Sequence, residues 1–180
     1  MVGLPVPRVE IGTVVGFAGQ QFAISHVHNE RGRPLVPKGR RYFHRTYSPE
    51  ERIGLRAASG LLPFLAWVAA TDHNDDSNLV VEAWDDDRCG IVAVDFGDAF
   101  MWGADEQAIV LPSAPALVTN VDPAVVRAAL TAIEGLSRRD ICAACAAAGY
   151  RPDTRERNER VLSERQRLLR AHLEQRGWLG

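Results

Sequence analysis

Residues 64–100 have the sequence FLAWVAATDHNDDSNLVVEAWDDDRCGIVAVDFGDAF, which contains the strongest structural signals of the chain. The segment at 61–70 is apolar on every side, which predicts a helix buried all round rather than an amphipathic one. A polar run at 71–78 follows it. Residues 79–84 and 91–94 then favour two strands joined by a polar turn. The sequence therefore predicts a buried helix, a polar loop and a β-hairpin, in that order.

The expected hairpin carries oxygen-bearing side chains at its open end. Asn78 stands at its entrance and Asp95 at its exit, so both are expected at one end of two paired strands. Mg²⁺ takes carboxylate and amide oxygens, usually one or two of them from the protein. Phosphoryl transfer also needs an aspartate that orients the attacking hydroxyl, and Asp72 lies in the polar run. The pattern predicts a nucleotide–magnesium site.

The order of these motifs resembles the catalytic loop and the metal-binding loop of kinase-like enzymes. TDHNDDSNLVV at 71–81 is similar to the loop of the phosphoinositide-kinase-like and HipA-like branches, and VDFGDAF at 94–100 is similar to their D-F-G or D-H-G strand end. GLPVPRVEI at 3–11 resembles a HipA-like segment that leads to the strand lining the adenine site. ERQRLLRAHLE at 164–174 resembles the last helix of that group.

The resemblance implies roles for five residues of this chain. Asp72 would be the catalytic base, and Asn78 and Asp95 would hold Mg²⁺. Phe96 and Gly97 would complete the cofactor-binding motif with Asn78 and Asp95, and the cofactors would be ATP and Mg²⁺.

The polar run departs from the pattern of these families by one residue. Asp72 and Asn78 are one position further apart than usual. Either the loop is one residue longer here, or the catalytic aspartate is Asp75 or Asp76. Counted at the usual spacing from Asp72, Ser77 occupies the expected asparagine position.

The N-terminal part predicts a smaller β element. Residues 4–27 alternate as a β-hairpin, and residues 28–47 read as an irregular polar connection. A kinase-like enzyme also uses a glycine-rich cover and a lysine on an N-lobe strand. The sole lysine, Lys38, lies in the connection, and no glycine spacing matches such a cover. We expect residues 1–47 to be a remnant N-lobe or hinge hairpin with its connection.

Capping signals predict that the rest of the chain is mainly helical. Ser48 with Glu51 fits a capping box, Asp122 opens a helix that ends near Leu136, and Ser137 caps a shorter one. A long helix is expected over 154–176. The expected fold is α+β: a single kinase-like domain over 1–180, in which 48–180 form a mainly helical C-lobe with the catalytic-loop hairpin.

Composition narrows the expected partners and compartment. A formal net charge of −2 gives no argument for nucleic acid, and no apolar stretch has the length that spans a bilayer. Residues 1–7 lack the pattern of a signal peptide. Three cysteines are too few for a disulfide framework, so we expect reduced thiols and a cytoplasmic protein without a membrane partner.

Two further groups of side chains are candidates for other chemistry. His26 and His28 share one strand face and His44 follows, which suits imidazole ligation of a metal, but no carboxylate or thiol stands at a fitting spacing. Cys142 and Cys145 form a C-x-x-C without a second pair for zinc. Their spacing puts both thiols on one helix face, as expected for small core residues.

One function and one rival follow from these patterns. The expected function is ATP- and magnesium-dependent phosphotransfer to a hydroxyl acceptor, on a protein or a small molecule, by a chain that lacks a full N-lobe. The rival is a catalytically degenerate, pseudokinase-like binding or interaction module. The missing phosphate lysine and glycine cover favour the rival, and the Asp, Asn and D-F-G pattern favours the enzyme.

Overall fold

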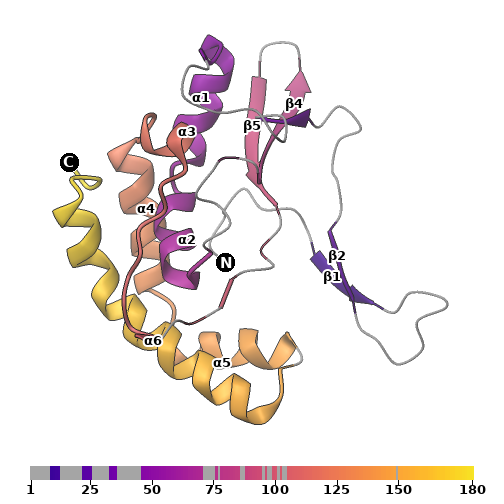
Figure 1. Cartoon of the computed structure of the whole chain (residues 1–180), viewed down its shortest axis with the longest axis vertical. Helices are drawn as coiled ribbons and strands as arrows, with labels where there is room; N and C mark the ends of the chain where they lie inside the picture. The colour runs from indigo at the N-terminus through magenta and orange to yellow at the C-terminus, as the bar shows by residue number, and fades with distance from the viewer. Residues whose placement is uncertain are drawn as a thin grey trace.

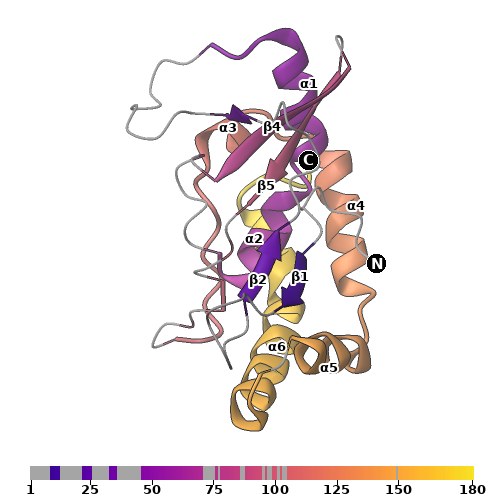
Figure 2. The ribbon, with the colours of Figure 1, turned by 90° about the vertical axis from the view of Figure 1, so that its right-hand side faces the viewer.

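The computed structural model of the chain combines helices with two small antiparallel sheets, seen from two sides in Figures 1 and 2. The residues that the structure describes are 9–12, 22–25, 33–35, 46–70, 76, 78–85, 88–94, 96, 99–100, 102, 105–148 and 150–180.

The described elements follow one another as β1 (Val9–Gly12), β2 (Phe22–Ser25), β3 (Arg33–Pro34), α1 (Pro49–Ala58), α2 (Leu61–Val68), β4 (Leu79–Asp85), β5 (Arg88–Ala93), α3 (Pro115–Val118), α4 (Pro123–Glu134), α5 (Arg138–Ala147) and α6 (Pro152–Gln175).

The helices form one body with α2 inside it. Helix α2 contacts α4 and α6, α5 packs along α6, and α1 contacts β5, α3 and α4. Figure 1 shows the sheet of β3, β4 and β5 on one side of this body, and the hairpin of β1 and β2 further out on the same side. The architecture is thus α+β and mostly helical.

Helices α1 and α2 begin where their sequence signals predict. The Ser48 hydroxyl accepts a hydrogen bond from the Glu51 N–H at 3.2 Å, and the Glu51 carboxylate accepts one from the Ser48 N–H at 3.1 Å. This confirms the capping box. Gly60 precedes α2, and a Cβ there would lie 3.3 Å from the Cβ of Ala129. The missing side chain therefore lets α2 approach α4 closely.

The expectation that α2 is buried all round is correct for all of its residues except one. Leu65 and Trp67 are only 1% and 7% exposed. Phe64 is half-buried, because it lies at the edge of the core, where it meets Phe96.

The C-terminal helices agree closely with the predicted segments. Asp122 caps α4 by accepting from the Ala124 N–H at 2.9 Å, and Ser137 caps α5 in a capping box with Asp140. Helix α6 covers about the length expected for the long helix and turns an apolar stripe to the core. The buried members of that stripe are Val161, Leu162, Leu169 and Leu173.

The sheets confirm two predicted hairpins and add one strand. Strand β4 pairs with β5 in antiparallel register, with Leu79 opposite Ala93, and β1 pairs with β2 inside the predicted 4–27 segment. The connection at 28–47 was expected to be irregular, but β3 within it pairs with the edge of β4. The Leu35 N–H extends this pairing to the Leu79 carbonyl at 2.8 Å. Proline is tolerated there because an edge strand needs fewer donors.

None of the helices among the described residues combines the length and the apolar character needed to cross a membrane.

Candidate functional site

The open end of the β4–β5 hairpin brings Asn78 next to the segment that leads to Asp95. The Val94 N–H donates a hydrogen bond to the Asn78 carbonyl at 2.9 Å, one step beyond the Leu79–Ala93 pair. Asn78 is half-buried at this point. Asp95 follows Val94 directly, but lies outside the described residues. The backbone pairing is therefore the part of the predicted metal site that the structure describes.

Asp76 anchors the polar run to the helical body. Its side chain is fully buried, and the Ala116 N–H donates to its two carboxylate oxygens at 3.1 and 2.8 Å. Ala116 lies in the first turn of α3, where backbone N–H groups have no partner within the helix. The Asp76 carbonyl also accepts from the Leu79 N–H at 3.1 Å.

This arrangement bears on which aspartate could serve as the expected base. A base that takes a proton from the hydroxyl group that receives the phosphoryl group must face that hydroxyl group. The carboxylate of Asp76 is buried and bonded to the backbone of α3, so it holds the loop in place instead. Asp72, Asp75 and Ser77 lie outside the described residues, and the choice between Asp72 and Asp75 stays a prediction.

Phe96 docks the segment after the hairpin onto α2. Its ring meets Phe64 edge-on, with centroids 5.9 Å apart, and Phe64 in turn meets Trp67 at 6.3 Å. The Phe96 carbonyl accepts from the Ala99 N–H at 3.0 Å, and the Phe100 N–H donates to the Val68 carbonyl at 2.9 Å. The chain thus returns from the hairpin to the end of α2.

Helix α6 fixes the end of α2 from which the polar run departs. Arg165 is 2% exposed, and its guanidinium donates to the carbonyls of Trp67, at 2.8 Å, and of Ala66. These carbonyls belong to the last turn of α2, where backbone acceptors lack helical partners. Burial lowers the pKa of Arg165, and the charge of Asp105 partly opposes that shift. The Trp67 indole N–H donates to the Leu162 carbonyl at 2.9 Å.

The backbone at both ends of the polar run takes an uncommon conformation. Ala69, which ends α2, has φ +52°, and Asp76 has φ +55°. Residues with a Cβ rarely adopt the left-handed region, which costs of order 1–2 kcal/mol for alanine. The surrounding contacts therefore hold the backbone in this conformation at Ala69, before the polar run, and at Asp76, near its end.

Several other candidate residues from the sequence lie outside the part of the chain that the structure describes: Gly97, Lys38, His26, His28 and His44. Among the described residues, no group of three or more histidine, cysteine, aspartate or glutamate side chains is arranged to hold a metal ion.

The C-x-x-C pair lies on α5, as predicted. Cys145 is buried and Cys142 is half-buried. A hydrogen bond with Glu159 raises the pKa of the Cys142 thiol, with a smaller contribution from burial, and burial is the main cause of the raised pKa of Cys145. A raised pKa keeps a thiol protonated and unreactive, which is typical of structural cysteines.

Sequence reasoning missed two residues that position the site. The role of Asp76 depends on α3, a four-residue helix too short to carry a periodic pattern, although Pro115 marks its start. Arginine side chains are mostly exposed in proteins, yet Arg165 is buried, because its donors satisfy the end of α2.

Comparisons with known proteins identify no relative: no family model matches the chain, and neither curated proteins nor solved structures contain a significant match.

Proposed function

We propose that the chain is an ATP- and magnesium-dependent phosphotransferase of the kinase-like class, which acts on a hydroxyl acceptor. One observation carries this proposal: the 2.9 Å hydrogen bond from the Val94 N–H to the Asn78 carbonyl. This bond pairs positions 78 and 94, and Asp95 is the next residue in the sequence. An amide and a carboxylate then belong to one end of the hairpin, as the resemblance to kinase-like metal loops requires.

The chemistry of these two side chains fits Mg²⁺. Both offer hard oxygen donors, and Mg²⁺ sites in phosphate-transferring enzymes use one or two carboxylates or amides together with phosphate oxygens. Asn78 and Asp95 would hold the ion. When bound, it would neutralise charge on the phosphates of ATP.

The proposed reaction assigns one task to each part of the loop. Asp72 orients the acceptor hydroxyl and takes its proton as the acceptor oxygen bonds to the γ-phosphorus. The bond from that phosphorus to the bridging oxygen breaks, and ADP leaves with the electron pair. Asp76 takes no proton in this scheme. It ties the polar run to α3 two residues before Asn78.

The sequence also supports a second candidate function. The chain contains a single lysine, Lys38, and the motif pattern gives it no place on a strand beside the phosphates. A pseudokinase-like module that binds nucleotide or a protein partner without phosphotransfer would need no such lysine. The same experiment separates the two candidates.

The test is a calorimetric titration with ATP, with and without magnesium, joined to a phosphotransfer assay. The parent is expected to bind ATP weakly and only with magnesium, because the metal replaces the missing lysine as the phosphate contact. Asp95→Ala should abolish binding. Asp72→Ala should leave binding nearly unchanged, since a base acts on the acceptor, and phosphotransfer should vanish in both variants.

Glu174→Ala, which removes an exposed carboxylate from the last turn of α6, is the control and should match the parent. Tight binding that ignores magnesium and tolerates Asp95→Ala would reject the metal-site proposal. Magnesium-dependent binding without phosphotransfer in the parent would favour the pseudokinase-like module. A parent that binds no ATP would reject both nucleotide-based schemes and leave an interaction module.

A further inference from the structure

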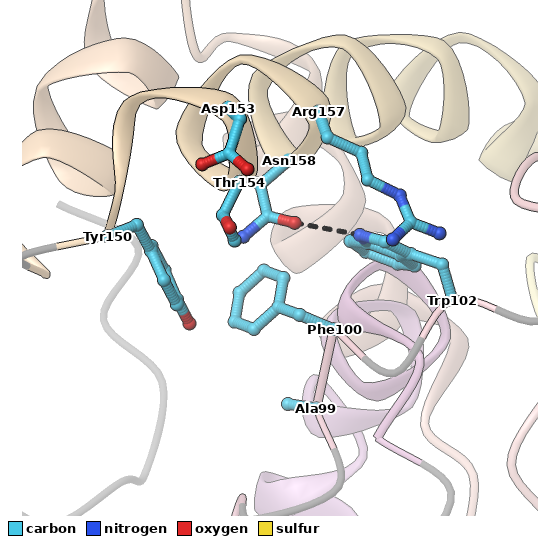
Figure 3. Close-up of a pocket in the computed structure, with 8 residues that line it drawn as sticks. All are labelled: Ala99, Phe100, Trp102, Tyr150, Asp153, Thr154, Arg157 and Asn158. Carbon is cyan, nitrogen blue, oxygen red and sulfur yellow. Dashed lines mark hydrogen bonds between the residues drawn. The ribbon is translucent and has the colours of Figure 1, made fainter.

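A cavity lies between Ala99, Phe100 and Trp102 on one side and the start of α6 on the other. Its volume is about 510 Å³. Figure 3 shows three aromatic side chains, Phe100, Trp102 and Tyr150, below and beside a row of polar residues from α6. None of these residues belongs to the proposed metal site.

The aromatic side chains form a fixed wall. The Phe100 ring lies edge-on to Trp102, with centroids 5.5 Å apart, and edge-on to Tyr150 at 6.3 Å. Phe100 has φ +65°, which is a rare conformation for a bulky residue and of the kind found at ligand sites. Its N–H bonds to the Val68 carbonyl, so the end of α2 holds this residue in place.

Asn158 is the buried polar group of the cavity. It is 2% exposed, and its Oδ1 accepts a hydrogen bond from the Trp102 Nε1–H at 2.8 Å. An indole N–H only donates, so this bond fixes which end of the amide faces Trp102. The Nδ2 donors must face the other way, and Figure 3 shows this nitrogen turned towards the Tyr150 side of the cavity.

The Nδ2 group of Asn158 lacks an acceptor within the described part of the chain. A buried amide donor without a partner costs free energy, and buried polar groups in folded proteins are nearly always satisfied. The cavity beside it supplies room for a molecule that brings an acceptor. A carbonyl oxygen is the simplest group of that kind.

The charges at the rim balance one another. Arg157 and Arg160 both pair with Glu106, the latter at 2.6 Å, and these two pairs lower the pKa of Glu106. Asp153 adds one carboxylate. Burial raises the pKa of Tyr150, so its phenol stays neutral at pH 7. Among the residues that line the cavity, Arg157 and Asp153 carry one charge of each sign, so the lining gives no preference for a strongly charged ligand.

We propose that this cavity binds a small, uncharged aromatic molecule that carries a carbonyl group, such as an aryl carboxamide. The ring lies against Phe100 and Tyr150, where edge and face contacts between aromatic groups are favourable. The carbonyl oxygen accepts from Asn158 Nδ2, while Oδ1 keeps its bond to Trp102. This site is independent of the proposed phosphotransfer, since it shares no residue with Asn78, Asp95 or Asp72.

The experiment follows the indole N–H resonances of the tryptophans in ¹⁵N–¹H spectra during titration with benzamide. The Trp102 resonance is identified by its loss in Trp102→Phe. Benzamide should shift it in a saturable way. Aniline has the ring without the carbonyl, and cyclohexanecarboxamide has the carbonyl without the aromatic ring. Each should bind at least tenfold more weakly, because each lacks one of the two recognised groups.

Asn158→Asp keeps an oxygen for Trp102 but replaces the Nδ2 donor, so benzamide affinity should fall at least tenfold. Asn120→Asp makes the same change at a half-buried position away from the cavity and should bind as the parent does. No saturable shift of Trp102, equal binding of aniline and benzamide, or parent-like affinity in Asn158→Asp would each overturn the proposal. If Asn158→Asp does not fold, the ratio of benzamide to aniline affinity in the parent decides it alone.

Discussion

Single residues hold the two ends of the polar run in different ways. At its start, Ala69 takes a left-handed conformation without a side-chain hydrogen bond, so the end of α2 bears the strain. At its end, Asp76 takes a similar conformation, but its carboxylate gains two contacts with the Ala116 N–H. Aspartate and asparagine tolerate this backbone region better than alanine does. The second end of the run is therefore held more firmly than the first.

We predict that Asp76→Ala destabilises the fold more than Asp76→Asn. The alanine leaves the buried Ala116 N–H without its acceptor, which costs of order 1–3 kcal/mol in the free energy of unfolding. The asparagine keeps one carbonyl oxygen and tolerates the left-handed backbone, so its cost should be about 1 kcal/mol or less. Urea unfolding of both variants and the parent measures the difference. Equal stabilities for the two variants would contradict the anchoring role.

The site residues differ in how far the sequence could predict them. The β4–β5 hairpin was predicted from two neighbouring strand patterns, and the structure confirms it, with the Val94 N–H bonded to the Asn78 carbonyl at its open end. The contact between Asp76 and Ala116 joins positions forty residues apart through a helix of one turn. No local pattern carries that information, because it arises only when α3 packs against the loop. The sequence therefore predicted the hairpin but not the anchor.

Among the elements, α2 is the one on which the site depends. Its apolar surface makes it part of the core, and its last turn is satisfied by α6 through the guanidinium of Arg165. The Trp67 indole adds a hydrogen bond to the Leu162 carbonyl. Since Asn78 and Phe100 are both reached from the end of this helix, its placement fixes the loop and the aromatic cavity together.

We predict that Trp67→Ala lowers the free energy of unfolding by about 3–5 kcal/mol, the usual cost of removing a large buried aromatic side chain. Trp67→Phe should cost less, because it keeps an aromatic ring in the core and loses chiefly the bond to the Leu162 carbonyl. Chemical denaturation followed by far-ultraviolet circular dichroism measures both. Leu168→Ala, at a half-buried position of α6, serves as a comparison for which a smaller loss of stability is expected. A Trp67→Ala variant as stable as the parent would show that α2 does not anchor the loop.

The helices and strands that could be predicted from the sequence are those that carry a local signal. Helices α1, α4 and α5 carry side-chain caps, at Ser48, Asp122 and Ser137, and a cap is a local signal. Strand β3 has two residues and forms because the edge of β4 offers backbone partners. That edge is created by the tertiary fold, so a reading of residues 28–47 alone could not predict the strand.

For the whole molecule, charge placement predicts how stability varies with pH. Hydrogen bonds with Arg160 and Arg157 lower the pKa of Glu106, and one with Arg167 lowers that of Glu164, below the ordinary value of 4.5. The contributions of these two carboxylates to the stability of the fold are therefore present above pH 4.5. They are lost as the pH falls through the pKa values of the two groups in the folded protein. The raised pKa values of the Cys142 and Cys145 thiols affect stability at alkaline pH. The contribution of these thiols to stability is present below the ordinary pKa of 9.0 and is lost as the pH rises further.

We predict a plateau of stability between about pH 4.5 and pH 9, with a decline on each side. Urea unfolding at a series of pH values measures the profile. Glu106→Gln should reduce the acid slope, because its two arginines then lose an ionisable partner, and Cys145→Ser should reduce the alkaline slope. A steep loss of stability near neutral pH would mean that some other group controls the profile.

The guanidinium of Arg165 also sets an order of events during synthesis on the ribosome. It is separated by 98 positions from Trp67, whose carbonyl it binds. At translation rates of about 5–20 residues per second, Arg165 is made roughly 5–20 s after the helix that it completes. During that interval the nascent chain holds the last turn of α2 without its donor. The aromatic cavity, which residues of α6 line, can therefore form only after α6 has been synthesised, however early the β4–β5 hairpin pairs.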